Sequence, residues 1–367
     1  MSKNKILYAL TCIYFVAVIV ISNFFLLERG ISNINGFNDC FETVIERFEL
    51  TQSEAQNLKT KDYFTTCHNS AYGDEIEYIA IAAGLNSYEP YSLRPLIPKI
   101  IGSLVSLSVT YEKDKTSFFR DIFIINQFLT VLFLLIGLIA IYHAVSRLTN
   151  ISYLKLVLPS IFLINIGVYQ TASFLMLDIA SYSVAAVCIY FTSNKNYFGL
   201  SLSIILGILI KEVLIIYSLC FILLFYQHRR FSLQQVLLSI APIVFFVGFR
   251  IFSDVDPLSM QYGWDISKGE IKLNYINSHL SYYAIPFLIK LFSTLGFPLI
   301  IFLSYYKNFK QNKFYICMFI LMFASIIFAN LLLAARVPRV VFVVYPFLAF
   351  IIAKVASDEG VHQIRKE

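Results

Sequence analysis

Ten long apolar segments constrain the fold of this chain more than any other feature of its sequence. A helix needs about 20 apolar residues to cross the roughly 30 Å hydrocarbon layer of a membrane. The segments cover residues 6–27, 122–143, 154–171, 175–193, 198–210, 213–226, 233–252, 282–305, 314–334 and 340–355, and three of them are on the short side. We therefore expect an all-α fold, a polytopic membrane helical bundle of about ten transmembrane helices.

Composition supports a membrane protein and excludes several other classes. Hydrophobic residues make up 58% of the chain and charged residues 14%, and the mean hydropathy is +0.71. Soluble domains carry about 25% charged residues, so an ordinary cytosolic enzyme or a disordered regulator is excluded. The net charge of +6 does not indicate a nucleic-acid partner, because the basic residues form short clusters between apolar segments.

The positions of these clusters predict the topology. Basic residues precede the first apolar segment and follow every second segment after it: Lys3, Lys5, Arg147, Lys195, Arg229, Arg230, Lys307, Lys310, Lys313, Arg365 and Lys366. Lys and Arg near short loops stay on the cytoplasmic side. We expect a multi-pass protein of a bacterial-type inner (plasma) membrane with both termini cytoplasmic. The first segment is long and lacks a small-residue cleavage site, so we expect a retained anchor rather than a signal peptide.

This topology divides the chain into three parts. Residues 1–27 form the first transmembrane helix, 28–121 form a large outer loop, and 122–367 form the remaining bundle, with a second outer loop at 253–281. The apolar stretch 98–111 is too short to cross, so we expect a juxtamembrane helix there.

Two of the six cysteines, Cys40 and Cys67, lie in the large outer loop. In an oxidising compartment we expect them to form a disulfide. The alternative is two unpaired thiols in a reduced or differently folded loop.

Charged residues beside the apolar segments are the candidates for function, since charges within a membrane bundle are costly. On the predicted outer side these residues are Asp178, Lys211, Glu212, Arg336 and Arg339, and the outer loop adds Asp74, Glu75, Glu77 and Arg94. A helix over 74–83 would place Asp74, Glu77 and Tyr78 on one face, opposite an apolar face. We expect these groups to gather at the outer membrane surface.

Carboxylates together with guanidinium groups suit one kind of reaction. A carboxylate can deprotonate an acceptor hydroxyl, while Arg side chains bind and neutralise a phosphate leaving group. The sequence contains no glycine-rich phosphate loop, no Ser/His/Asp set and no Cys-x-x-Cys motif. Machinery for nucleotide hydrolysis or serine-type acyl transfer is therefore not evident.

The order of these elements resembles the GT-C superfamily of membrane glycosyltransferases, which use polyprenyl-phosphate sugars. The resemblance rests on Asp-x-x-x-Tyr at 74–78, Pro-x-x-x-Arg-Pro-Leu-x-Pro at 90–98, Asp178, the Lys211-Glu212 pair, and Arg-Val-Pro-Arg at 336–339. It implies a GT-C-like fold that transfers a sugar from a polyprenyl-phosphate donor to a hydroxyl of a glycan, lipid or protein acceptor. Membrane lipid is a further expected partner.

The resemblance also implies roles for individual residues. Asp74 would be the catalytic base, with Glu75 and Glu77 as substitutes. The expected substrate-binding residues are Tyr78, Arg94, Asp178, Lys211, Glu212, Arg336 and Arg339. Some GT-C enzymes use a divalent metal ion and others do not, and the spacing of the carboxylates here does not decide between them.

Each of these interpretations has a structural alternative. Asp74 would cap a helix, with Glu77 completing a capping box. Arg94 would orient a proline-flanked turn, Asp178 would cap a helix, and the adjacent Lys211 and Glu212 would neutralise each other. The two late arginines, 336 and 339, would anchor the chain at lipid headgroups, and Glu75 and Glu77 would be solvated.

Two other functions stay open at this point. One is a polysaccharide polymerase or ligase that uses pyrophosphate-linked oligosaccharides, for which the arginines would matter at least as much as a base. The other is a transporter or flippase of lipid-linked sugars, which should show internal repeats. No such repeat is evident in the sequence.

Overall fold

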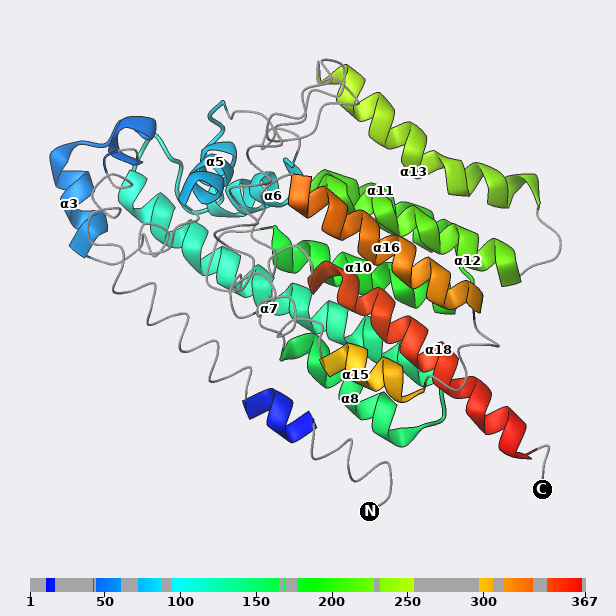
Figure 1. The fold of residues 1–367 in the computed structure, drawn as a ribbon. Helices are drawn as coiled ribbons and strands as arrows, with labels where there is room; N and C mark the ends of the chain where they lie inside the picture. Colours follow the sequence, from blue (N-terminus) through cyan, green and yellow to red (C-terminus); the bar gives the residue numbers. More distant parts are fainter. Residues whose placement is uncertain are drawn as a thin grey trace.

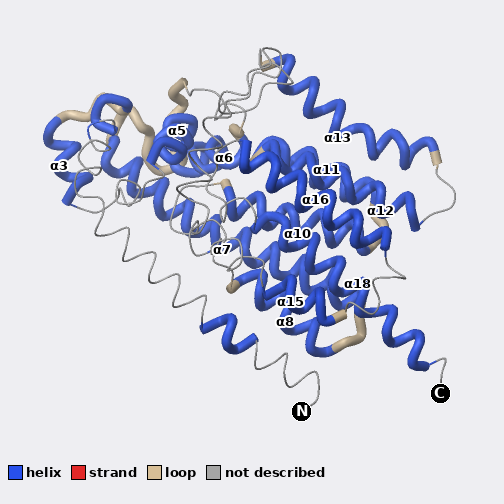
Figure 2. Tube along the Cα trace, in the orientation of Figure 1, coloured by secondary structure: helices blue, strands red, loops and turns tan. Residues whose placement is uncertain are grey.

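In the computed structural model, the described part of the chain consists of helices joined by turns and short loops (Figure 2). That part comprises residues 11–16, 42, 44–60, 72–86, 94–164, 168, 177–227, 232–253, 297–305, 313–332 and 342–364. No β-strand occurs within these ranges, which agrees with the expected all-α class. Cys40, Cys67 and residues 254–281 of the second outer loop lie outside the described residues.

Three short helices from the predicted outer loop gather at one end of the molecule (Figure 1). They are α3 (Gln52–Thr60), α5 (Tyr72–Ala82) and α6 (Leu96–Val105). We call them the outer layer. Their buried apolar side chains belong to one apolar core, to which residues from other parts of the chain also contribute, among them Phe48, Phe118, Leu177 and Ile210. A helix does occur where the juxtamembrane helix was expected at 98–111, but α6 spans Leu96–Val105, so it begins two residues earlier and ends six residues earlier.

One long helix, α7 (Lys115–Leu148), connects the outer layer to the bundle. Its 34 residues make it about 51 Å long. Asp114 caps its first turn, because the Asp114 side chain accepts a hydrogen bond from the Ser117 backbone N–H at 3.0 Å. Phe118 and Phe119 then pack into the core of the outer layer. The predicted segment 122–143 is therefore the middle of a longer helix.

The bundle packs around α10 (Asp178–Ser193), which is buried over most of its length. Small side chains such as Ala185 and Ala186 let neighbouring helices approach it closely. On one side, Phe162 of α8 (Ser152–Leu163) stacks on Tyr182 with ring centroids 4.1 Å apart.

The other helices complete the bundle around this core. They are α11 (Tyr197–Ile210), the 3₁₀ helix η2 (Glu212–Ser218), α12 (Leu219–Gln227), α13 (Leu233–Phe252), α15 (Phe297–Ser304), α16 (Lys313–Leu332), η6 (Phe342–Val344) and α18 (Tyr345–Ile364). Buried tyrosines join distant elements: the Tyr217 hydroxyl donates to the Val343 carbonyl at 2.7 Å. The Tyr345 hydroxyl donates to the Leu158 carbonyl at 2.5 Å.

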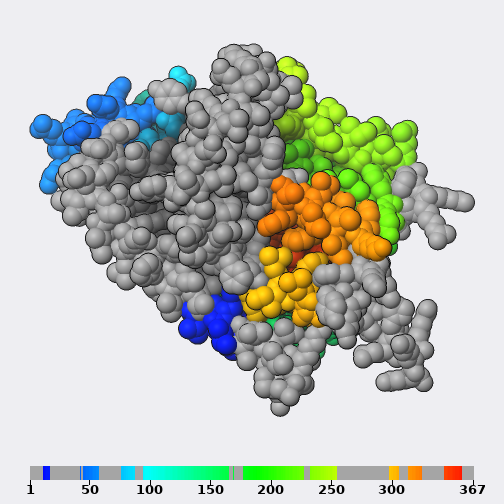
Figure 3. All heavy atoms as spheres, viewed as in Figure 1, coloured from blue at the N-terminus to red at the C-terminus, as the bar shows by residue number. Residues whose placement is uncertain are grey.

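Two helices of the described chain, α7 and α13, are long and apolar enough to cross a membrane. Neither is mostly buried, as the core helix of a soluble protein would be. The outward side chains of α13 are apolar, with Val244 62% and Phe252 91% exposed, and they form part of the surface in Figure 3. These helices indicate membrane association. Other predicted segments correspond to shorter helices: α11 has 14 residues and is about 21 Å long.

Candidate functional site

The site begins at a chain reversal between α11 and η2. The Lys211 backbone N–H donates to the Gly207 carbonyl at 2.7 Å, which closes the last turn of α11. Leu214 of the returning chain then packs over Gly207, where a Cβ atom would lie 2.8 Å from the Leu214 Cδ1 atom. Because Gly207 has no side chain, the chain can turn back tightly and place Lys211 and Glu212 at the reversal.

Glu212 forms a bidentate ion pair with Arg94, the residue directly before the proline that precedes α6. The Arg94 Nε and Nη2 atoms donate to the two Glu212 carboxylate oxygens, each at 2.7 Å. Arg94 Nη1 also donates to the Tyr78 hydroxyl of α5 at 3.0 Å. The Arg94 side chain is only 6% exposed and that of Glu212 21% exposed. This contact joins residues 118 positions apart and links the outer layer to the bundle.

Lys211 makes a second ion pair, with Asp178. The Lys211 Nζ atom donates to Asp178 Oδ1, and Asp178 is the first residue of α10. The two side chains are 10% and 1% exposed. Each of the two adjacent residues thus pairs with a distant partner, although the charge of Lys211 also lowers the pKa of Glu212.

The electrostatics of the Arg94–Glu212 pair keep both groups charged. Burial alone would raise the pKa of Glu212, but the charge and hydrogen bonds of Arg94, together with a backbone hydrogen bond and the charge of Lys211, outweigh burial, and the pKa falls below its ordinary value. Burial likewise disfavours the charge of Arg94, yet the Glu212 carboxylate holds the pKa of Arg94 above its usual range. With Lys211 and Asp178, the four charges sum to zero, so the cluster presents no net positive charge.

A third ion pair fixes α5 within the outer layer. Arg47 Nε and Nη2 contact the Glu77 carboxylate oxygens at 3.3 and 3.4 Å, and Nη2 also donates to the Asn86 carbonyl. The expectation of a solvated Glu77 is wrong, because Glu77 is only 8% exposed; Tyr78 beside it is 1% exposed. Sequence reasoning missed Arg47, since nothing local distinguishes it from other polar residues of the loop.

Of the remaining predicted site residues, the structure describes only the backbone or nothing at all. α5 begins at Tyr72, so Asp74 lies inside its first turn and not at the N-cap position. Asp74 precedes Tyr78 by four residues, a spacing that places both on one side of a helix. The side chains of Asp74 and Glu75, and the whole of 336–339, lie outside the described part of the structure.

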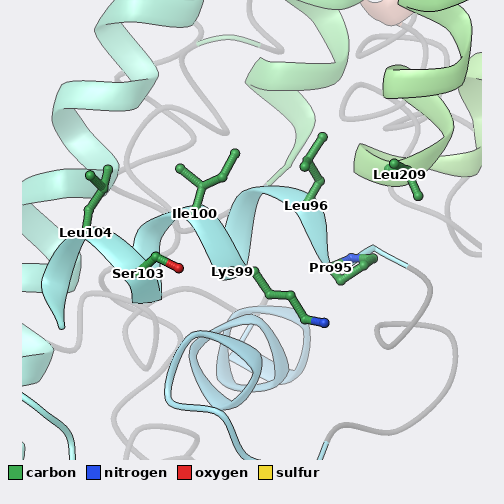
Figure 4. A pocket seen from close by; sticks show the side chains of 7 residues that line it. All are labelled: Pro95, Leu96, Lys99, Ile100, Ser103, Leu104 and Leu209. Atoms are coloured by element: carbon green, nitrogen blue, oxygen red, sulfur yellow. The ribbon is translucent and has the colours of Figure 1, made fainter.

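An apolar pocket of about 360 Å³ lies along α6 (Figure 4). Its lining residues are Pro95, Leu96, Lys99, Ile100, Ser103, Leu104 and Leu209. Pro95 directly follows Arg94, and Leu209 lies two residues before Lys211, so the chain itself brings pocket and cluster together. Sequence reasoning did not single out this pocket, although the four-residue spacing of Leu96, Ile100 and Leu104 was a signal for an apolar helix face.

The described residues include no group of three or more His, Cys, Asp or Glu side chains that could hold a metal ion. What the described cluster offers is a rigid set of paired charges, a buried tyrosine and an adjoining apolar pocket. Comparison of the chain with protein-family models, with curated proteins and with solved structures gives no match.

Proposed function

We propose that this chain is an integral membrane glycosyltransferase with a GT-C-like bundle of about ten transmembrane helices. It transfers a sugar from a polyprenyl-phosphate donor to a hydroxyl of a glycan, lipid or protein acceptor on the extracytoplasmic side. One observation carries this proposal. Five residues singled out from the sequence, Tyr78, Arg94, Asp178, Lys211 and Glu212, meet in one cluster beside an apolar pocket.

Asp74 serves as the general base in this proposal. Its carboxylate takes the proton of the acceptor hydroxyl, and the acceptor oxygen forms a bond to the anomeric carbon of the sugar. The bond between that carbon and the phosphate oxygen breaks, and its electron pair leaves with the lipid phosphate. Asp74 lies one helical turn before Tyr78, which contacts Arg94, so the base sits on the helix that the cluster holds in place.

The ion pairs act in this scheme by positioning. Arg94 and Glu212 fix α5 and the start of α6 against η2, and Lys211 fixes the reversal against α10. A catalytic group must be held within a fraction of an ångström of its working position, and rigid supporting contacts provide that precision. The exposed apolar surfaces of α7 and α13 support a setting in lipid, where a polyprenyl-linked donor resides.

The test uses Asp74→Asn in the full chain, reconstituted in vesicles with a polyprenyl-phosphate sugar and a hydroxyl acceptor. We expect sugar transfer to fall at least about a hundredfold, the lower bound for loss of a general base, while donor binding is retained. The matched control is Glu112→Gln, an exposed carboxylate of the same outer region, which should keep full activity.

Other outcomes of the same assay would contradict the proposal. Full sugar transfer by Asp74→Asn would show that Asp74 is not the general base. Transfer only from pyrophosphate-linked oligosaccharides would indicate a polymerase or ligase. Movement of the lipid-linked sugar across sealed vesicles without a new glycosidic bond would indicate a flippase.

A further inference from the structure

The cation available to the adjoining pocket is not one of the two cations of the charged cluster. Arg94 and Lys211 were expected to bind phosphate, but both are buried and paired with carboxylates of the protein. Lys99 lines the pocket, is exposed, and forms no ion pair with any residue in the described ranges. Lys99 is therefore the lining residue that can meet a negative charge.

Helix α6 is apolar on two faces, and only one of them is covered. Ile97, Ile101 and Val105 pack into the core of the outer layer. Leu96, Ile100 and Leu104 project from another side and line the pocket, with Leu209 of α11 nearby (Figure 4). Ile100 and Leu104 are 39% and 40% exposed, an arrangement that suits an apolar occupant.

The two properties together define the chemistry of the occupant. The apolar row suits a hydrocarbon chain. The Lys99 side chain, which points away from that row (Figure 4), places its ammonium group to one side of it, where it suits one anionic head. The pocket of about 360 Å³ lies near the small end of ligand pockets, which span about 300–1,000 Å³. It can take a segment of one chain, whereas a membrane glycerophospholipid carries two.

We propose that this pocket binds the phosphate-proximal segment of the polyprenyl chain of the donor, with Lys99 on the phosphate. The inference rests on the proposed function and deepens it. The contiguity of Pro95 with Arg94 and of Leu209 with Lys211 places the phosphate next to the charged cluster. Lys99 thus supplies the positive charge that the neutral cluster does not.

The experiment measures binding of farnesyl phosphate carrying a photoreactive group to the full chain in lipid nanodiscs. We expect labelled peptides from α6 and the end of α11. Lys99→Gln should weaken binding about tenfold, the loss of one charge-assisted contact, and Lys99→Arg should restore most of it. The matched control, Lys113→Gln, removes an exposed lysine outside the pocket and should bind like the unmodified protein.

Two further measurements separate the contribution of the ligand's hydrocarbon chain to binding from that of its phosphate. Photoreactive farnesol, which lacks the phosphate, should bind equally to the unmodified protein and Lys99→Gln. Ile100→Trp should fill the pocket and reduce labelling by both probes, with the helical circular dichroism spectrum unchanged.

Specific outcomes would overturn the inference. Equal affinity of Lys99→Gln and the unmodified protein for farnesyl phosphate would show that Lys99 does not bind the phosphate. Displacement of the probe by phosphatidylglycerol at equal concentration would show a general lipid site. If the binding results hold but no sugar transfer occurs, the pocket stands and the proposed function fails. If transfer occurs and Lys99→Gln binds normally, the function stands and the inference fails.

Discussion

Arg94 is the residue on which the candidate site depends most. Its guanidinium group makes two hydrogen bonds to Glu212 and one to Tyr78, so a single side chain holds α5, the start of α6 and η2 together. A buried charge is tolerable only while it is paired and hydrogen-bonded. Loss of one partner should therefore cost more than loss of both.

Replacement of Glu212 by Gln leaves Arg94 buried without its counter-charge. We expect the free energy of unfolding at pH 7 to fall by about 3 kcal/mol, the lower end for breaking a buried pair because Glu212 is partly exposed. The double variant Arg94→Met/Glu212→Gln should recover a large part of this loss. Chemical unfolding in detergent, followed by circular dichroism, measures both values, and strictly additive losses would contradict the coupling.

The same pair gives stability a pH dependence with a definite sign. The pKa of Glu212 is lowered in the folded protein, so its carboxylate stabilises the fold above its ordinary value of 4.5. That stabilisation disappears as pH falls from 4.5 through the lowered pKa. We therefore expect the advantage of the unmodified protein over Glu212→Gln to be full at pH 6 to 7 and to shrink below about pH 4.5. An advantage independent of pH would rule out an ionic origin.

The identities of the cluster residues could be predicted, but their pairing could not. Asp178, Lys211 and Glu212 stand out because charges beside apolar segments are costly. Adjacent residues on a helix do not face each other, and here the reversal sends Lys211 to Asp178 and Glu212 to Arg94. Those partners are 33 and 118 residues away, so tertiary packing, which local sequence does not encode, selects them.

At the scale of elements, the contact between α5 and α6 positions both the cluster and the pocket. Gly102 of α6 faces the backbone of Ala82 at the end of α5, and a Cβ atom at position 102 would lie 2.1 Å from the Ala82 carbonyl oxygen. Only glycine permits this approach. The contact keeps Tyr78 on α5 within reach of Arg94 at the start of α6.

Gly102→Ala should therefore separate the two helices. We expect a loss of about 1–3 kcal/mol in the free energy of unfolding, the usual cost of overpacking, and weaker binding of farnesyl phosphate. Gly248→Ala in α13 is the matched control, because a Cβ atom there has open space. That change should leave stability unchanged or raise it by up to about 1 kcal/mol, since Ala favours helix. Equal effects of the two changes would show that the close approach is unimportant.

Apolar length predicts the described helices better than amphipathic pattern does. The segment 233–252 coincides with α13, and 198–210 nearly coincides with α11. The segment 122–143 underestimates α7, because its first turns carry Lys115, Arg120 and Asp121 and pack in the outer layer. Two residues of the face expected to be polar on α5, Glu77 and Tyr78, are buried, and Glu77 pairs with Arg47. Sequence alone does not reveal the partner that a charged residue such as Glu77 has in the folded protein, so the residue is expected to be solvated.

At the scale of the whole molecule, two ends of the helical bundle can be distinguished. The outer layer and the charged cluster lie at one end, where α10 begins at Asp178 (Figure 1). The 16 residues of α10 separate this end from the turn at Lys195 by about 24 Å. If the chain spans a membrane as proposed, that distance places the turn between α10 and α11 on the cytoplasmic side, as the basic residues there predict.

Cysteine labelling tests this orientation. Lys113, before α7, and Lys195, after α10, are both exposed, and each is changed to Cys in a chain whose six native cysteines are replaced. A membrane-impermeant maleimide should label Lys113→Cys on intact cells, and label Lys195→Cys only after the membrane is permeabilised. Labelling of both cysteines from the same side would contradict a membrane-spanning bundle between positions 113 and 195. The reverse pattern would place the cluster and its pocket in the cytoplasm, where an extracytoplasmic transferase cannot work.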